Sequence, residues 1–128
     1  MRLLLDTHAF IWADSLPEKL SPAAKMACED PANELILSVA SVWEMQLKIT
    51  LGKLALRKPL RSMIADWTEQ NAVVILPVRL EHIFHLETLS ARHKDPFDRL
   101  LIAQALAESL TIVSHDRAFP QYNIPVIW

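Results

Sequence analysis

The stretch RLLLDTHAFIWA, residues 2–13, joins a short apolar run to a helical pattern through a single acid. RLLLD predicts a buried strand, because a short and nearly continuous apolar run suits a strand that is covered on both faces. THAFIWA predicts a helix that begins directly behind it. A strand followed at once by a helix is typical of a parallel sheet, since parallel strands need a long crossover connection between them.

The same alternation continues along the rest of the chain. ELILS (34–38) predicts the next strand, and a helical pattern over 39–51 follows it, with Gly52 placed to end the helix in a left-handed conformation. Further strands are predicted at AVVILPV (72–78), TIVS (111–114) and IPVIW (124–128), and further helices over 22–30, 60–70, 80–90 and from Pro96 onward. The predicted fold class is therefore α/β, with a mainly parallel central sheet covered by helices on both faces.

Size and composition limit the class of protein. The chain has 128 residues, 52% of them hydrophobic, which predicts one domain over residues 1–128 with a substantial core. No apolar run is long enough for a signal peptide or a membrane span, so we expect a cytoplasmic protein. Cys28 is the only cysteine, which excludes an internal disulfide and a thiolate-rich zinc site. Its acidic neighbours favour a structural thiol over a nucleophile.

The formal net charge of -2 hides an uneven distribution of charged residues. Residues 1–44 sum to -4, residues 45–65 to +5 and residues 66–128 to -3. We refer to the cationic residues of the middle stretch as the basic segment: Lys48, Lys53, Arg57, Lys58 and Arg61. The pattern fits a solvated face and a phosphate-contacting surface equally well. The acidic overall balance excludes a general duplex-coating protein.

A second informative stretch is HKDPFDRLLIAQALA, residues 93–107, where two aspartates lie three residues apart at the head of a predicted helix. Asp95 fits the N-cap position and Pro96 the first helical residue. Asp98 is explained less well by capping, because it shares a helix face with the apolar residues three, four and seven positions later. A carboxylate on that buried face needs a partner from elsewhere in the chain.

Other acids are predicted to lie at the same edge of the sheet. Ligand sites of parallel α/β sheets lie beyond the carboxyl ends of the strands. Asp6 ends the first predicted strand, Asp116 follows a late strand, and Glu44 lies one turn into the helix after ELILS. Each of these acids alone has an ordinary structural explanation in a turn or cap. Together with Asp98 they predict an acidic cluster at this rim.

Four converging carboxylates favour a bound cation, because several like charges within a few ångströms must otherwise take up protons. Oxygen ligands without cysteine suit Mg²⁺ or Mn²⁺ better than zinc. Such an ion polarises a phosphoryl oxygen and lowers the pKa of a bound water, which is chemistry suited to phosphodiester hydrolysis. The spacing of the acids indicates a metal site without naming its substrate.

Four stretches together resemble a known family: LLLDTHAFIW at the start, SVWEMQLK in the middle, HKDPFDRLLIAQA near the end and IVSHD after it. They resemble the PIN domain, and in particular the VapC-type toxin ribonucleases of bacterial toxin–antitoxin pairs. The resemblance covers essentially the whole chain and keeps the order of the motifs. It implies an α/β/α sandwich, usually dimeric, that acts as a metal-dependent endoribonuclease on RNA and is inhibited by a cognate antitoxin protein.

The resemblance also implies roles for single residues. The acidic cluster falls on Asp6, Glu44, Asp98 and Asp116, with Mg²⁺ as the expected cofactor and Mn²⁺ as a substitute. Asp6 and Asp98 are expected to be metal ligands, Asp116 a ligand either directly or through water, and Glu44 a ligand or the group that orients the attacking water.

Supporting polar residues lie next to these acids. Thr7 and Ser114 are expected either to donate hydrogen bonds to the carboxylates or to act as local caps. Arg99, beside Asp98, is expected either to face phosphate or to pair with an acid.

Histidines and tryptophans receive less specific predictions. His82 and His85 have a spacing compatible with a metal site, but a surface or core role is the stronger interpretation. His8, His93 and His115 each flank a predicted site acid and are placed near the site without an essential role. The tryptophans, at positions 12, 43, 67 and 128, are expected in the core or an interface rather than as base-stacking platforms, since they do not interleave with the basic segment.

Two rival functions remain open from the residues alone. A phospho-acceptor signalling domain is also a small parallel α/β domain with acids at strand ends, but here the third predicted strand ends without an acid and no lysine follows Lys94. The second rival is a non-catalytic binding module whose acids only cap helices. Stabilisation by Mg²⁺ would distinguish it, because scattered caps should not respond to the ion.

Overall fold

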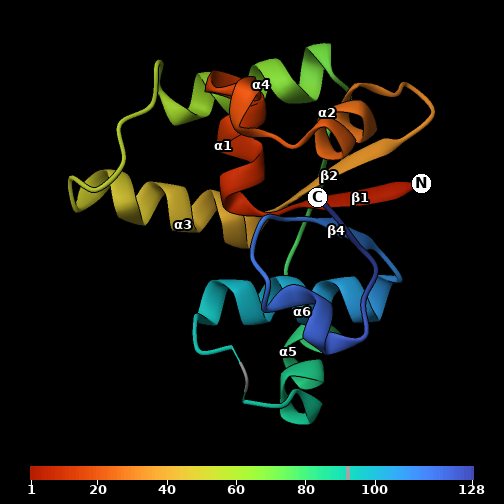
Figure 1. Ribbon diagram of the computed structural model, residues 1–128. Coiled ribbons are helices and arrows are strands. Elements are labelled where there is room, and N and C mark those ends of the chain that lie inside the picture. Colours follow the sequence, from red (N-terminus) through yellow and green to blue (C-terminus); the bar gives the residue numbers. More distant parts are fainter. Residues whose placement is uncertain (92) are drawn as a thin grey trace.

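A parallel sheet forms the centre of the molecule (Figure 1). The computed structural model describes residues 1–91 and 93–128, and within them the sheet has five strands in the order β3-β2-β1-β4-β5. The strands are β1 (Arg2–Leu5), β2 (Glu34–Ser38), β3 (Val74–Leu76), β4 (Thr111–Val113) and β5 (Val126–Ile127). Every pair of neighbours is parallel. The predicted α/β class with a parallel central sheet is confirmed.

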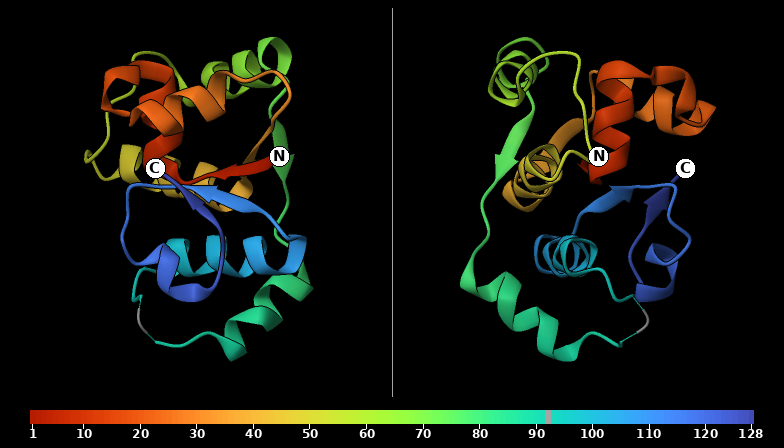
Figure 2. Two further views of the ribbon diagram at one scale, coloured as in Figure 1. Left: turned by 45° about the vertical axis from the view of Figure 1, so that its right-hand side comes forward. Right: turned by 90° about the vertical axis from the view of Figure 1, so that its left-hand side faces the viewer.

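Helices cover both faces of this sheet, as Figure 2 shows from two sides. They are α1 (Thr7–Ser15), α2 (Pro22–Glu29), α3 (Val39–Thr50), α4 (Leu60–Gln70), α5 (Leu80–His85) and α6 (Pro96–Glu108). Short 3-10 turns lie at Pro17–Lys19, Leu86–Thr88 and Phe119–Tyr122. In the part of the chain that the structure describes, no helix combines the length and apolar character needed to cross a membrane.

Alternating side chains of β1 divide the core into two halves. Leu3 and Leu5 pack into a cluster with residues of α1, α2 and α4, whereas Leu4 packs into a second cluster with residues of α6. All three leucines are fully buried. This explains the continuous apolar run, because a strand that is covered on both faces has no polar side.

Several predicted elements are shorter in the structure than in the sequence pattern, among them the strand predicted over 124–128, which is limited to β5. The strand predicted over 72–78 is limited to β3, where Ala72 has a positive φ of 53° on one side and Pro77 follows on the other. Pro77 has no N–H to donate to a neighbouring strand. The helix predicted over 80–90 ends at His85 and continues as the 3-10 turn Leu86–Thr88.

Predicted helix ends are mostly confirmed. Gly52, with φ of 72°, follows α3 in the left-handed conformation, and its N–H donates to the Ile49 carbonyl at 3.0 Å. Asp95 is the N-cap of α6, with its carboxylate accepting from the N–H groups of Phe97 and Asp98. The Asp95 cap fixes the start of α6 at Pro96.

Candidate functional site

A cleft of about 650 Å³ lies at the carboxyl edge of the sheet, where β1 and β4 are neighbours. Asp6 follows β1, Asp116 follows β4, and Asp98 lies in the first turn of α6; all three line the cleft. The structure therefore brings together three of the four predicted site acids from positions far apart in the sequence.

Asp6 lines this cleft, is held by two hydrogen bonds and is only 5% exposed. One carboxylate oxygen accepts the N–H of Ala9 at 2.7 Å, and the other accepts the hydroxyl of Ser114 at 2.5 Å. The Ser114 oxygen in turn accepts the N–H of Asp116 at 3.0 Å. Burial raises the pKa of Asp6, against the lowering effect of these hydrogen bonds. The predicted hydrogen bond from Ser114 to a site carboxylate is confirmed.

Glu44 lies beside the cleft rather than on its wall. Its buried carboxylate accepts the Thr7 hydroxyl at 2.6 Å through one oxygen and the Lys48 ammonium at 2.8 Å through the other. Glu44 is near enough to contribute to the raised pKa of Asp98. The structure thus places the fourth predicted acid at the edge of the cluster and confirms that Thr7 donates to a carboxylate.

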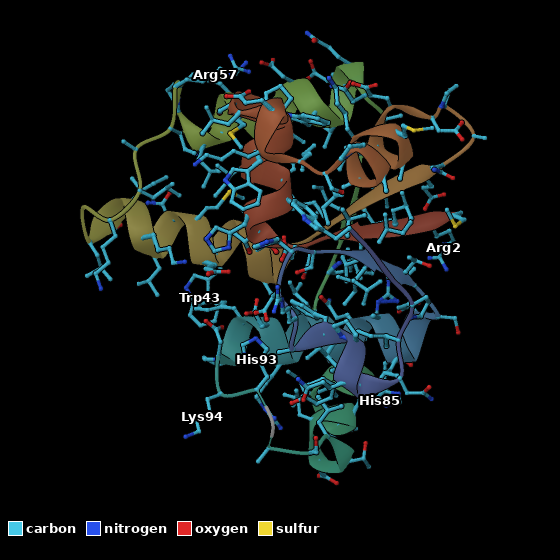
Figure 3. The ribbon with its side chains drawn as sticks, viewed as in Figure 1. Arg2, Trp43, Arg57, His85, His93 and Lys94 are labelled. Carbon is cyan, nitrogen blue, oxygen red and sulfur yellow. The ribbon has the colours of Figure 1, made fainter. Side chains whose placement is uncertain are left out.

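Asp98, Asp116 and His93 form the most exposed part of the cluster. The Nε2 atom of His93 lies 3.0 Å from an oxygen of Asp98 and 3.0 Å from an oxygen of Asp116. Its Nδ1 accepts the N–H of Asp95 at 3.3 Å, so Nε2 is the ring nitrogen that faces both carboxylates. Figure 3 shows His93 beside the start of α6.

The electrostatics of Asp98 differ from those of a simple helix cap. Burial first, and the negative charges of Asp95, Asp6 and Glu44 in addition, raise its pKa to about 7, while His93 opposes this rise. A capping carboxylate near a helix N-terminus would instead favour its charged form. Asp95 makes the capping hydrogen bonds, and Asp98 faces the acidic cluster.

The approach of His93 to the acids depends on a neighbouring network. Its N–H donates to the Tyr122 hydroxyl at 2.5 Å, and its carbonyl accepts from the Arg99 guanidinium at 3.1 Å. Arg99 also donates to the Ser90 carbonyl at 2.8 Å. Arg99 therefore holds two backbone carbonyls that precede α6. Among residues 1–91 and 93–128 it forms no ion pair, so the predicted pairing with an acid is wrong, whereas the predicted phosphate contact stays a prediction.

The basic segment does not form one free cationic face. Lys48 pairs with Glu44, and Arg57 makes two hydrogen bonds to Asp14 at 2.9 and 3.0 Å. Lys58 pairs with Asp66. Within residues 1–91 and 93–128, only Lys53 and Arg61 of this segment make no ion pair.

His82 is a core histidine, as the stronger interpretation predicted. It is fully buried, and although Glu81 and Glu108 lie near it, both ring nitrogens already have protein partners. Nδ1 accepts the N–H of Arg79 at 3.0 Å, and Nε2 donates to Glu108 at 2.9 Å. Cys28 is half-buried, and burial together with Glu29 raises its pKa to about 11, which fits an unreactive thiol.

Sequence reasoning missed part of the cleft wall. Trp12, expected in the core or an interface, lines the cleft together with His8, His115 and Arg117. The available signal was its position on the face of α1 that follows Asp6, one turn after His8. Trp43 is exposed and packs edge-on against Phe97, between α3 and α6 (Figure 3).

The donor set fits a hard divalent cation. One atom each from His93, Asp98 and Asp116 lies within 4.8 Å of the others, and the oxygens of Asp6 line the same cleft. Burial is the largest cause of the raised pKa values of Asp6 and Asp98, and neighbouring carboxylates raise both further. Carboxylate oxygens with open space on one side are the ligands that Mg²⁺ and Mn²⁺ prefer.

Comparison with known proteins assigns the chain to a family. The sequence profile of the PIN domain matches residues 3–125. This chain belongs to the PIN-domain family. The PIN domain described here is 30% identical over 124 residues to Ribonuclease VapC22 of Mycobacterium tuberculosis, an alignment that covers 96% of this chain and 93% of the relative.

Solved structures share the fold of this PIN domain. A chain of VapBC2 from Rickettsia felis, solved bound to a DNA fragment from their promoter, superposes with a TM-score of 0.71 at 15% identity, covering 98% of this chain and 97% of that one. VapBC-1 from nontypeable Haemophilus influenzae gives a TM-score of 0.66 at 17% identity, covering 98% and 96%. At these identities the likeness concerns the fold alone.

Proposed function

We propose that this PIN domain is a divalent-metal-dependent endoribonuclease and the toxin of a toxin–antitoxin pair. The observation that carries the proposal is the convergence of Asp6, Asp98 and Asp116 on one open cleft, with Glu44 at its edge. Family membership and the 30% identity to a protein named a ribonuclease support the choice of RNA as substrate.

Asp6, Asp98 and Asp116 would hold the cation, which is Mg²⁺ with Mn²⁺ as a substitute. Bound there, the ion would polarise a phosphoryl oxygen and supply a water of lowered pKa. Asp6 is preorganised for this task, because Ser114 and the N–H of Ala9 fix both of its oxygens. Its rigid position limits the movement needed when a ligand binds.

Glu44 would orient the attacking water or complete the ligand set. Its carboxylate is held in one orientation by the Lys48 ammonium and the Thr7 hydroxyl. A charged acceptor beside the cleft can accept a hydrogen bond from water at the moment of attack. This arrangement distinguishes the chain from a phospho-acceptor domain, since β3 ends at Leu76 before a proline and offers no acceptor aspartate.

An antitoxin protein and a second copy of the chain are the proposed partners. The supporting observation is that the solved structures with this fold include proteins named VapBC2, bound to promoter DNA, and VapBC-1. Expression of this chain alone should inhibit growth. Co-expression of the protein encoded beside the chain should relieve that inhibition.

The function is tested by incubating the purified protein with total RNA in the presence of Mg²⁺ or Mn²⁺ and mapping the new ends. Internal cuts at a restricted set of positions are expected. The matched control is the Asp98→Asn variant purified in the same way, which excludes a contaminating nuclease. Absence of internal cuts with either ion would refute the proposal.

Lys48 and Lys53 provide a matched pair for the role of the basic segment. We expect Lys48→Met to slow RNA cleavage, because the Lys48 ammonium holds the Glu44 carboxylate at 2.8 Å beside the cleft. Lys48 lies beside Glu44, whereas Lys53 makes no ion pair within the described ranges. Lys53→Met should therefore have the smaller effect. Equal effects of the two changes on cleavage over a salt series would contradict a special role for Lys48.

A further inference from the structure

The cleft has lining residues that the metal chemistry does not use. Besides the carboxylates, it is lined by the side chains of His8, Trp12 and His115, which we call the aromatic wall, and by Arg117. At about 650 Å³ the cleft has the size of a small-molecule binding site rather than that of a single ion.

Several rings from distant parts of the sequence meet at this wall. Trp12 lies 5.9 Å from His8, 6.3 Å from His115 and 5.8 Å from Trp128, measured between ring centroids. His115 and Trp128 are 5.3 Å apart. These pairs are tilted by 46° to 60°, so none of them is a parallel stack that would consume the ring faces of its members.

Core packing explains only part of this arrangement. Trp12 and Trp128 are half-buried and pack against the apolar cluster beneath α1. His8 and His115, in contrast, are exposed and line the cleft. Their rings bury little apolar surface, so core packing does not explain their position. An exposed ring at the mouth of a cleft is suited to contact with a flat partner.

Cations flank the aromatic wall. Arg117 is exposed and forms no ion pair with any residue in 1–91 or 93–128. The Lys19 ammonium lies 5.7 Å from the centroid of the Trp12 ring. Aromatic faces combined with positive charges are the features by which proteins hold single-stranded nucleic acid, because bases stack on rings while phosphates contact the cations.

We propose that the aromatic wall is a subsite for one nucleobase of the RNA strand, next to the phosphate that is cleaved at the acidic cluster. This subsite rests on the ribonuclease function proposed above, and the aromatic wall is the part of the cleft that would contact a base of the substrate. Since the wall and the carboxylates share one cleft, the bound base belongs to a nucleotide that flanks the cut. At that position, the subsite would bind a nucleotide that carries a base more tightly than an abasic residue.

The test uses an oligoribonucleotide whose cut position has been mapped, with a single abasic residue placed in turn at each position around the cut. For the unaltered protein, loss of the base at one flanking position should lower kcat/KM about tenfold or more, as expected for loss of one base–aromatic stack. Trp12→Leu and His115→Ala should slow cleavage of the intact strand and no longer discriminate against that abasic substrate. Trp12→Phe, which keeps a ring, should retain the discrimination.

Phe84→Ala is the matched control, because Phe84 is an exposed aromatic residue on α5 that does not line the cleft. It should behave as the unaltered protein. Two results would overturn the subsite. One is equal cleavage of all abasic substrates, and the other is a decrease in kcat/KM in Trp12→Leu and His115→Ala that is the same with and without the base.

A binding measurement separates this failure from failure of the ribonuclease function. Adenosine and uridine monophosphates are titrated against the intrinsic tryptophan fluorescence in the presence of Mg²⁺, with no cleavage required. The dissociation constant obtained from the quenching should rise at least fivefold in Trp12→Leu and His115→Ala and stay unchanged in Phe84→Ala. This result supports the subsite even if no RNA is cut. Absence of quenching with both nucleotides overturns it and leaves the aromatic wall as a surface for a protein partner.

Discussion

Replacing Asp98 by asparagine should lower the rate of RNA cleavage by about a hundredfold or more, because the neutral amide cannot supply the anionic oxygen that holds the cation. Asp98 contributes one of the atoms that, with those of His93 and Asp116, lie within 4.8 Å of one another. Cleavage rates measured at saturating Mg²⁺ for the two proteins test this directly.

The same substitution should not destabilise the metal-free protein. The charged form of Asp98 is disfavoured by burial and by Asp95, Asp6 and Glu44, so removal of its charge relieves repulsion. The melting temperature without metal should therefore stay the same or rise. The further increase produced by Mg²⁺ should shrink, since the ion stabilises the folded state only as far as it binds there.

Asp95→Ala is the matched control, three residues away on the same turn. Asp95 caps α6 by accepting the N–H groups of Phe97 and Asp98 at 2.8 and 3.1 Å. Its loss should lower the free energy of unfolding by about 1 kcal/mol and leave measurable activity. An Asp98→Asn enzyme that stays active, with an undiminished stabilisation by Mg²⁺, would remove Asp98 from the metal site.

Removing the divalent cation should abolish cleavage and make stability strongly dependent on pH. An excess of chelator should stop RNA cleavage, and Mg²⁺ or Mn²⁺ should restore it, because the acidic cleft repels a polyanionic substrate until a cation is bound. Full activity in excess chelator, in a preparation whose Asp98→Asn counterpart is inactive, would contradict the metal mechanism.

The direction of the pH effect follows from the raised pKa of Asp98. This carboxyl has a pKa of about 7 in the folded protein against 3.8 for the unperturbed group, and the pKa of Asp6 is raised as well. Between these two values the folded state holds a proton that the unfolded state has released, so the free energy of unfolding falls as pH rises. The metal-free protein should therefore melt at a lower temperature at pH 8 than at pH 5.

Mg²⁺ should reverse the fall in melting temperature with rising pH. The ion binds the deprotonated carboxylates, and protons compete with it for them at low pH. Stabilisation by Mg²⁺ should consequently be largest at pH 8 and small at pH 5. Melting curves at several pH values, with chelator and with saturating Mg²⁺, measure both effects. Asp98→Asn should flatten the metal-free profile; an equally steep profile in that variant would place the responsible protons elsewhere.

The sequence by itself determined the alternation of strands and helices and the rim on which the acids gather. These properties depend on neighbours in the chain: the apolar run of RLLLD predicts β1, Gly52 can adopt the left-handed conformation after α3, and Asp95 caps the helix that it precedes. In a parallel sheet, the position of an acid at the end of a strand also fixes the edge on which it lies. Asp6 and Asp116 could therefore be assigned to one site before any contact was known.

Only the tertiary structure decided which side chains complete the site. His93 meets Asp116 across 23 residues, the exposed Arg57 pairs with the buried Asp14, and Trp12 lines the cleft. Helix and strand periodicity arise from each residue's near neighbours, whereas these contacts depend on how packed elements orient side chains that are distant in the sequence, which no local pattern encodes.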